Sequence, residues 1–252
     1  ENKICSYNKL NYCDRYNRSI KVKNSVNRIN VVELMHEELK KLNINHDSGK
    51  EETVYIEVGP GDGNATDILS ANFNKKILYE PNEVYKNILE KKGYTVKYDI
   101  FQNYLPSFNT TFDVFVLSHV LYYFEPETIK HLLQTLHKFK KDKNSKILIV
   151  LGPFEEAENR EVLIEAAKEF GWKDSMIKMR TDQDLVKKIL IELKLDYKLI
   201  EMTYNTPIKS KEELFDIFFF SLVEVYLYDI YGSLNELDLK KLEEIAKRIY
   251  SK

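Results

Sequence analysis

The sequence predicts an α/β protein with a doubly wound, mostly parallel sheet and helical elements that cap it on the N-terminal and C-terminal sides. Short apolar runs of strand length alternate with helical patterns between residues 53 and 151. This alternation is typical of parallel strands joined by crossover helices. A glycine-rich turn, Gly59-Pro-Gly-Asp-Gly63, directly follows the first strand-like run. In such sheets ligands bind beyond the carboxyl ends of the strands, where this turn lies.

The size and composition are those of one globular unit with additions. The chain has 252 residues, of which 43% are hydrophobic and 31% are charged. This length fits one large α/β domain, or a core domain with a modest cap. We therefore expect an N-terminal cap on the substrate side at 1–48, a Rossmann-like core at 49–205, and a C-terminal helical cap at 206–252.

The net charge, the apolar runs and the cysteine count argue against nucleic-acid binding, a membrane helix and a disulfide framework. The net charge is -2, whereas nucleic-acid-binding enzymes usually need a strongly basic surface. The most apolar run, 214–231, is interrupted by Asp216, Glu224 and Asp229, so no membrane helix is expected. Cys5 and Cys13 do not make a disulfide framework. We expect a cytoplasmic monomer or weak homodimer, without nucleic acid, membrane or metal.

The first half of the chain contains three predicted strands. A helical pattern places Val32, Met35, Leu39 and Leu42 on one face. The run 53–58 reads as a buried strand, and Asn64 can cap the helix that begins after the glycine turn. Strands are then predicted at 76–80 and 94–98, with a helix at 82–92 between them.

The second half continues the alternation. Strands are predicted at 112–117 and 146–151, on either side of a helix at 126–139. A helix at 181–193 and a sixth strand at 197–203 follow. The last two predicted elements are helices at 211–231 and 236–250.

Acidic residues follow the second and third strands at the edge where the glycine turn lies. Glu80 ends the second strand, where a carboxylate can accept hydrogen bonds from both ribose hydroxyls of a nucleoside. Asp99 ends the third strand and is placed to accept a hydrogen bond from an adenine amino group, and Phe101 can pack on the adenine face. The sequence therefore predicts a nucleoside-binding edge.

The spacing of the glycines distinguishes between nucleoside cofactors. The dinucleotide fingerprint is Gly-x-Gly-x-x-Gly, but its third glycine is replaced by Asn64 here. The pattern Glu57-x-Gly59-x-Gly61-x-Gly63 instead resembles the first motif of class I S-adenosylmethionine-dependent methyltransferases. The segment 117–124 also resembles the fourth motif of that family, which borders cofactor and acceptor.

This resemblance implies a Rossmann-like methyltransferase sheet and S-adenosylmethionine as the cofactor, with S-adenosylhomocysteine as the product. In the family the turn wraps the methionine part of the cofactor, Glu80 matches the ribose-binding acid, and Asp99 matches the acid at the adenine edge. The predicted cofactor-binding residues are Glu57, Gly59, Pro60, Gly61, Gly63, Glu80, Pro81, Asp99, Ile100, Phe101, Ser118 and His119.

Several segments are similar to the histamine N-methyltransferase-like branch of this family, among them Leu121-Tyr122-Tyr123 and 180–185. His119 stands where that branch has a glutamine, and Asn27 occupies the possible place of its acidic cap residue. The branch also ends in a seventh strand, whereas this chain ends at Lys252 in or just after a helix. The predicted substrate-binding residues are Tyr16, Asn27, His119, Tyr122, Tyr123 and Phe219.

The leading functional hypothesis is methyl transfer to a small-molecule acceptor, at a nitrogen of an amine or heteroaromatic compound. The predicted catalytic residues are His119, Tyr122 and Tyr123. His119 orients the acceptor or acts as a general base, or else is an inert histidine packed under the cofactor. Both tyrosines either shape the pocket or belong to the core. The alternatives are a protein or peptide methyltransferase and a catalytically silent scaffold subunit.

Overall fold

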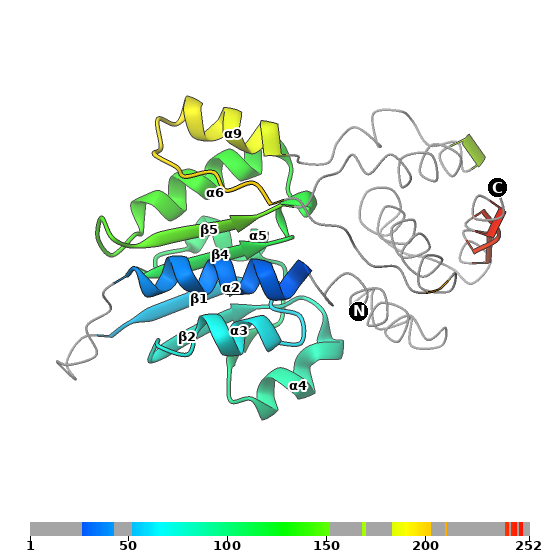
Figure 1. The fold of residues 1–252 in the computed structure, drawn as a ribbon, viewed down its shortest axis with the longest axis horizontal. Helices are drawn as coiled ribbons and strands as arrows, with labels where there is room; N and C mark the ends of the chain where they lie inside the picture. Colours follow the sequence, from blue (N-terminus) through cyan, green and yellow to red (C-terminus); the bar gives the residue numbers. More distant parts are fainter. Residues whose placement is uncertain are drawn as a thin grey trace.

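The computed structural model describes residues 27–42, 52–151, 168–169, 183–202, 210, 240–241, 243–245 and 247–248. Within these residues, five parallel strands form one sheet in the order β3-β2-β1-β4-β5 (Figure 1). The strands are β1 (Val54–Val58), β2 (Lys75–Tyr79), β3 (Thr95–Lys97), β4 (Val114–Ser118) and β5 (Lys146–Val150). The predicted α/β class and the five core strands are confirmed, with shifts of one or two residues at their ends.

Helices connect the strands, as the sequence predicted. The α-helices are α2 (Asn27–Lys40), α3 (Asn64–Leu69), α4 (Lys86–Lys91), α5 (Phe101–Tyr104), α6 (Pro126–Lys138) and α9 (Gln183–Glu192). The short 3-10 helices are η3 (Glu83–Tyr85), η4 (Leu105–Ser107) and η5 (Leu121–Tyr123). Pro126 stands in the first turn of α6, where its missing N–H costs nothing.

Both faces of the sheet are buried, which makes the fold doubly wound. One apolar cluster joins α5, α6 and α9 to the face of β1 that carries Val54, Ile56 and Val58. The other joins α2, α3 and α4 to the opposite face, which carries Tyr55. In Figure 1, α2 and α3 cross in front of the strands, and α9 lies beside α6. The period of two along β1 thus divides its side chains between two cores.

The strand order reverses at the centre of the sheet. β1 pairs on one side with β2 and on the other with β4, although β4 is three strands later in the chain. At such a switch point the loops after the two neighbouring strands diverge and leave a crevice beyond the carboxyl ends. The loops that follow β1, β2 and β4 are therefore the parts of the fold to search for a site.

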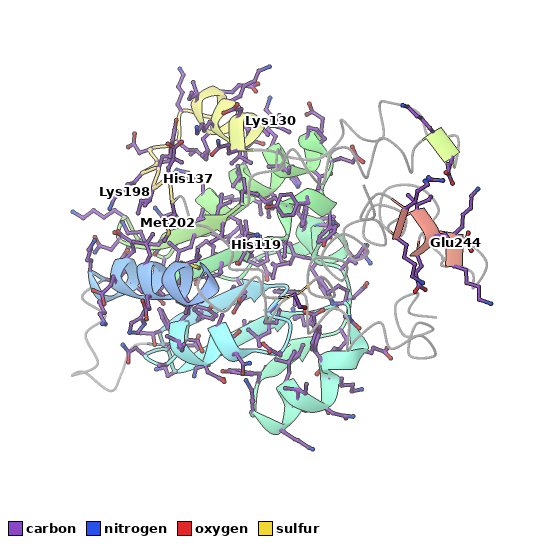
Figure 2. All side chains as sticks on the ribbon, turned by 45° about the vertical axis from the view of Figure 1, so that its right-hand side comes forward. His119, Lys130, His137, Lys198, Met202 and Glu244 are labelled. Carbon is purple, nitrogen blue, oxygen red and sulfur yellow. The ribbon has the colours of Figure 1, made fainter. Side chains whose placement is uncertain are left out.

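The predicted sixth strand is wrong over 197–202, which is not a strand; Thr203 lies outside the described residues. All residues from 196 to 202 are exposed, and Lys198 Nζ lies 2.9 Å from Glu38 Oε1 of α2. Lys187 of α9 lies 3.7 Å from Glu201. Figure 2 labels Lys198 and Met202 in this segment. Ion pairs connect the segment to α2 and α9, and residues 197–202 form no strand ladder.

The structure describes only part of the C-terminal region in which two helices were predicted. Residues 240–241, 243–245 and 247–248 are helical, in agreement with the predicted helix at 236–250. The predicted helix at 211–231 lies outside the described residues. No helix in the described part of the chain is long and apolar enough to cross a membrane. The same residues contain no group of three or more metal-ligating side chains.

Candidate functional site

The turn between β1 and α3 is a tight glycine turn with left-handed backbone. Gly59 has φ +71° and Gly61 has φ +59°, angles that residues with a Cβ rarely adopt. The Gly59 N–H donates to Tyr79 O of β2 at 2.8 Å, and the Gly63 N–H donates to Pro60 O at 3.1 Å. The turn is thus joined both to itself and to the neighbouring strand.

Gly59 also allows a close approach from the loop after β4. A Cβ added at Gly59 would lie 2.5 Å from Val120 Cγ1, a distance that real Cβ atoms do not reach. In contrast, a Cβ added at Gly61 would meet nothing within 4 Å. The space in front of Gly61 is therefore open, and the glycine turn and the loop after β4 are in contact at Gly59.

The helix cap differs from the prediction. Gly63 occupies the N-cap position of α3, and Asn64 is the first helical residue. Asp62 Oδ1 accepts a hydrogen bond from the Asn64 N–H at 3.1 Å, and the Asn64 side chain donates to Asp62 Oδ2 at 2.7 Å. The prediction of Asn64 as the cap is wrong, because an aspartate two residues earlier bonds the first free N–H of the helix.

Glu80 follows β2 and turns toward the glycine turn. Its side chain is buried, and its Oε2 accepts a hydrogen bond from the Gly61 N–H at 3.0 Å. Its Oε1 accepts one from the Asn82 N–H at 2.8 Å. Two backbone donors therefore orient the carboxyl group beside the open space at Gly61.

The protonation of Glu80 is poised near neutrality. Burial raises the pKa of the Glu80 carboxyl from its ordinary 4.5 to about 7. The hydrogen bonds from Asn82 and Gly61 oppose the shift, and the nearby Glu57 adds to it. A carboxyl group in this state changes charge close to physiological pH.

Glu57 has a different environment from the one predicted. Its carboxylate is buried under α3, where Oε2 accepts hydrogen bonds from the Tyr55 hydroxyl at 2.8 Å and the Thr66 hydroxyl at 2.7 Å. The structure therefore does not support the prediction that Glu57 contacts the cofactor directly. Its carboxylate instead joins β1 to the first turn of α3. Both of its hydroxyl partners, Tyr55 and Thr66, are buried as well.

The loop after β3 contains three predicted cofactor residues with different exposure. Asp99 is exposed; it accepts hydrogen bonds from the Ile100 N–H at 2.7 Å and from Asn103 Nδ2 at 2.9 Å. Ile100 is 45% exposed. Phe101 is only 1% exposed and packs edge-on against the rings of Tyr79 and Phe115. The prediction that Phe101 packs on the adenine face is wrong, because the aromatic core covers its ring.

His119 comes directly after Ser118, the last residue of β4, and has an unusual backbone. Its φ is +57°, and its N–H donates to Val150 O at 2.9 Å. Left-handed backbone is uncommon outside glycine and costs energy, so it is a reason to look for function. His119 is half-buried, and Figure 2 labels it on the ribbon.

The tyrosines that follow are placed differently from each other. Tyr122 is half-buried, with its hydroxyl 3.5 Å from His119 Nδ1 and its ring stacked at 6.3 Å between centroids. Tyr123 is 37% exposed, and its carbonyl accepts a hydrogen bond from Gln102 Nε2 at 3.1 Å. The structure thus pairs Tyr122 with His119, whereas Tyr123 is connected to the loop after β3.

Three predicted substrate residues are not placed by the structure. Tyr16 and Phe219 lie outside the described residues, and Asn27 is described only as the first residue of α2, without its side chain. Asp62, Val120 and Gln102 also contribute to this edge, and the sequence did not single them out. Of these, Asp62 had a detectable signal, since aspartate two residues before a helix N–H is a common turn residue.

Taken together, the residues fit an adenosine-containing cofactor. The turn offers open space at Gly61, and a carboxyl group at the end of β2 is bonded to the same residue. The exposed Asp99 follows β3, Pro60 lies within the turn, and Pro81 follows Glu80. The two carboxyl groups are acceptors for hydroxyl and amino groups, and they follow two neighbouring strands of the sheet.

Comparisons with known proteins show what this chain is similar to. The profile of a methyltransferase domain family matches residues 30–172, more than half of the chain. The chain is similar to the cyclopropane synthase MmaA2 from Mycobacterium tuberculosis, with 13% identity, a TM-score of 0.52, and coverage of 88% of this chain and 79% of that one. A SAM-dependent methyltransferase from Archaeoglobus fulgidus has 16% identity, a TM-score of 0.47, and coverage of 91% and 90%. No curated protein matches significantly.

The family match decides the class of the protein. The chain belongs to the methyltransferase domain family, since the matched residues include β1 through β5 and the glycine turn. It is a methyltransferase that uses S-adenosylmethionine. The solved structures, at such low identity, show the fold alone.

Proposed function

We propose that this methyltransferase acts on a small molecule and methylates a nitrogen of an amine or heteroaromatic compound. The observation that carries the proposal is the His119–Tyr122 pair beside the glycine turn. In this proposal the imidazole of His119 and the phenol of Tyr122 face the polar acceptor. The resemblance of Leu121-Tyr122-Tyr123 to the histamine N-methyltransferase-like branch supports a small amine as the acceptor.

The proposed cofactor site uses the glycine turn, Glu80 and Asp99. Gly61 leaves room for close approach to the main chain, Glu80 accepts hydrogen bonds from the ribose hydroxyls, and Asp99 accepts one from the adenine amino group. S-adenosylmethionine supplies an activated methyl group on its sulfonium. Positioning of the acceptor in line with that methyl group is then the main task of the protein, and it can contribute several kcal/mol, roughly 7 or more.

In the proposed step, the lone pair of the acceptor nitrogen forms a bond to the methyl carbon while the carbon–sulfur bond breaks. The bonding electrons stay on sulfur, and S-adenosylhomocysteine leaves. The methylated nitrogen loses one proton, and His119 accepts it or passes it to water. In this proposal Tyr122 orients the imidazole, since its hydroxyl lies 3.5 Å from His119 Nδ1. The acceptor pocket is completed in this proposal by the caps at 1–48 and 206–252, with Tyr16, Asn27 and Phe219.

The cofactor assignment is tested by calorimetric titration with S-adenosylhomocysteine, with NAD titrated in parallel. We expect micromolar affinity for S-adenosylhomocysteine and no binding of NAD. Glu80→Ala should weaken the first interaction strongly, whereas Glu127→Ala on the exposed face of α6 is the matched control. Unchanged affinity in Glu80→Ala would reject the ribose assignment, and binding of neither compound would favour the silent scaffold.

The acceptor assignment needs a second assay. The wild-type protein is incubated with S-adenosylmethionine and a panel of small primary and heteroaromatic amines, with a set of peptides beside them. Release of S-adenosylhomocysteine with the amines supports the proposal, and release with the peptides alone favours the protein methyltransferase. His119→Gln separates the two proposed roles. If His119 is the general base, the rate falls by about 10²–10⁴, and if it only orients the acceptor, the fall is smaller.

A further inference from the structure

A hydrogen bond connects the loop after β3 to the loop after β4. Gln102, the second residue of α5, donates from Nε2 to the carbonyl oxygen of Tyr123 at 3.1 Å. Tyr123 is the last residue of η5 and lies 21 positions later in the chain. The bond spans from the side of the sheet where Asp99 lies to the side where His119 and Tyr122 lie.

The donor end of this bond is held firmly. Phe101, next to Gln102, is 1% exposed and packs against the rings of Tyr79, Phe108 and Phe115. Asp99 bonds both the Ile100 N–H and the Asn103 side chain, so it closes the first turn of α5. Any ligand that binds at Asp99 and Ile100 therefore acts on a short, well-anchored helix.

The acceptor end belongs to a turn that adjoins the His119–Tyr122 pair. Leu121 is fully buried, and the N–H groups of Tyr123 and Phe124 donate to the carbonyls of Val120 and Leu121 at 3.1 and 3.2 Å. The last carbonyls of a helical turn lack partners within the turn, and Gln102 bonds one of them. The position of η5 thus depends in part on α5.

We propose that Gln102 is a positioning residue that couples cofactor binding at the β3 loop to the order of the η5 turn beside the acceptor. The inference rests on the proposed cofactor site. Cofactor contact with Asp99 and Ile100 restrains α5, and Gln102 transmits that restraint to Tyr123 and so to Tyr122. Gln102 itself touches neither cofactor nor acceptor in this role.

The test measures amide hydrogen exchange by NMR at Tyr123 and Phe124, with and without saturating S-adenosylhomocysteine. Gln102→Met keeps the length of the side chain but removes the donor, and Gln102→Glu replaces the donor with an ionised acceptor. Gln134→Met, on the exposed face of α6, is the matched control. Circular dichroism and the exchange of β1 amides verify that each variant is folded.

In the wild type and in Gln134→Met, S-adenosylhomocysteine should slow exchange at Tyr123 and Phe124. In both Gln102 variants the ligand should still protect Gly61 and Gly63, with affinity within about threefold of wild type, while the added protection at Tyr123 and Phe124 falls by about fivefold. A merely structural role would change exchange at these amides equally with and without ligand.

Two results separate this inference from the proposed function. If S-adenosylhomocysteine binds and slows exchange at Tyr123 and Phe124 equally in the wild type and in Gln102→Met, the inference is overturned and the cofactor site stands. The same holds if the ligand binds the wild type without slowing exchange there. If the wild type does not bind the ligand at all, the cofactor site fails and the coupling fails with it.

Discussion

At the scale of single residues, Gly59 and Val120 compete for the same small volume. A side chain at Gly59 would require φ +71° and would place its Cβ 2.5 Å from Val120 Cγ1. Two loops that belong to different strands can therefore meet only because position 59 has no side chain. The contact between these two loops therefore depends on the absence of a single atom, the Cβ at position 59.

Gly59→Ala should lower the free energy of unfolding by about 3 kcal/mol, because left-handed backbone strain and overpacking add together. Val120→Ala in the same chain should recover about 1–2 kcal/mol of that loss, since it removes the clashing methyl group. Urea denaturation of both single variants and the double variant measures the coupling. Additive effects would show that the two residues do not share the space.

Gly61→Ala is the matched case without a clash, because nothing lies within 4 Å of the added Cβ. Only strain at φ +59° remains, so we expect a loss of about 1 kcal/mol in stability. The affinity for S-adenosylhomocysteine should fall by at least about tenfold if the open space receives the cofactor. An unchanged affinity, measured by calorimetry, would place the cofactor elsewhere.

Glu80 makes stability depend on pH in a direction opposite to that of most carboxylates. Its folded-state pKa, about 7, is above its ordinary 4.5, so the folded protein binds more protons between these values. Glu80 therefore contributes roughly 3 kcal/mol to the free energy of unfolding below pH 4.5, and this contribution is lost as the pH rises toward 7. In urea titrations between pH 5 and 7.5, the free energy of unfolding of Glu80→Gln should fall less with rising pH than that of the wild type. Parallel curves for both proteins would contradict the assignment.

The pKa of Glu80 also predicts how the affinity for the cofactor product varies with pH. A ribose-binding Glu80 must be ionised to accept two hydroxyl hydrogen bonds, so affinity for S-adenosylhomocysteine should rise up to about pH 7 and level off above it. The expected slope below that point is about tenfold for each pH unit. Calorimetry at several pH values measures it, and a flat profile would show that binding does not require the ionised form.

At the scale of elements, α6 shows how a periodic pattern fixes a helix face. Ile129, Leu132, Leu133 and Leu136 are almost fully buried against β4, β5 and α9. Gln134, between two of them, is exposed. The helix is held by this apolar stripe, and its polar face contributes little.

Leu132→Ala should therefore lower the free energy of unfolding by about 2–5 kcal/mol, through lost burial and a residual cavity. Gln134→Ala should change it by less than about 0.5 kcal/mol. Urea denaturation of the two variants provides the comparison. A small effect of Leu132→Ala would mean that α6 does not belong to the cooperative core.

At the scale of the whole molecule, ligand binding and folding are linked because the proposed site is assembled from loops after β1, β2, β3 and β4. These loops come together only in the folded sheet. A ligand that binds only the folded state stabilises it by mass action.

S-adenosylhomocysteine at one hundred times its Kd should add about 2.7 kcal/mol to the stability. For a chain of this size the melting temperature should rise by roughly 5–10 °C. NAD at the same concentration should leave it unchanged. Differential scanning calorimetry detects both outcomes, and an equal shift with NAD would favour a dinucleotide site instead.

The parts of the fold and site that the sequence predicted well are local ones. The strands β1 to β5 were recognisable because short apolar runs and turn residues are local patterns. The glycine turn and Glu80 were also recognisable, because their positions follow from the ends of β1 and β2. The missing glycine at Asn64 already favoured a methyltransferase motif over a dinucleotide fold.

Tertiary structure decided which side chains are available. Phe101 reads equally well as a stacking platform or a core ring, and only the neighbouring rings of Tyr79 and Phe115 place it in the core. Glu57 is buried between β1 and α3, where the hydroxyls of Tyr55 and Thr66 donate hydrogen bonds to it. The segment 197–202 has strand-like composition, but a strand also needs a partner that supplies the ladder.

The sequence by itself thus determined the class of fold and the order of the elements, and it predicted the edge at which the site lies, because periodicity and turn chemistry are encoded over a few residues. Only the tertiary structure decided that Gly59 touches Val120, that Glu80 is bonded to Gly61, and that Gln102 reaches Tyr123. These contacts join residues from different crossovers, and their distances depend on how the whole sheet is packed.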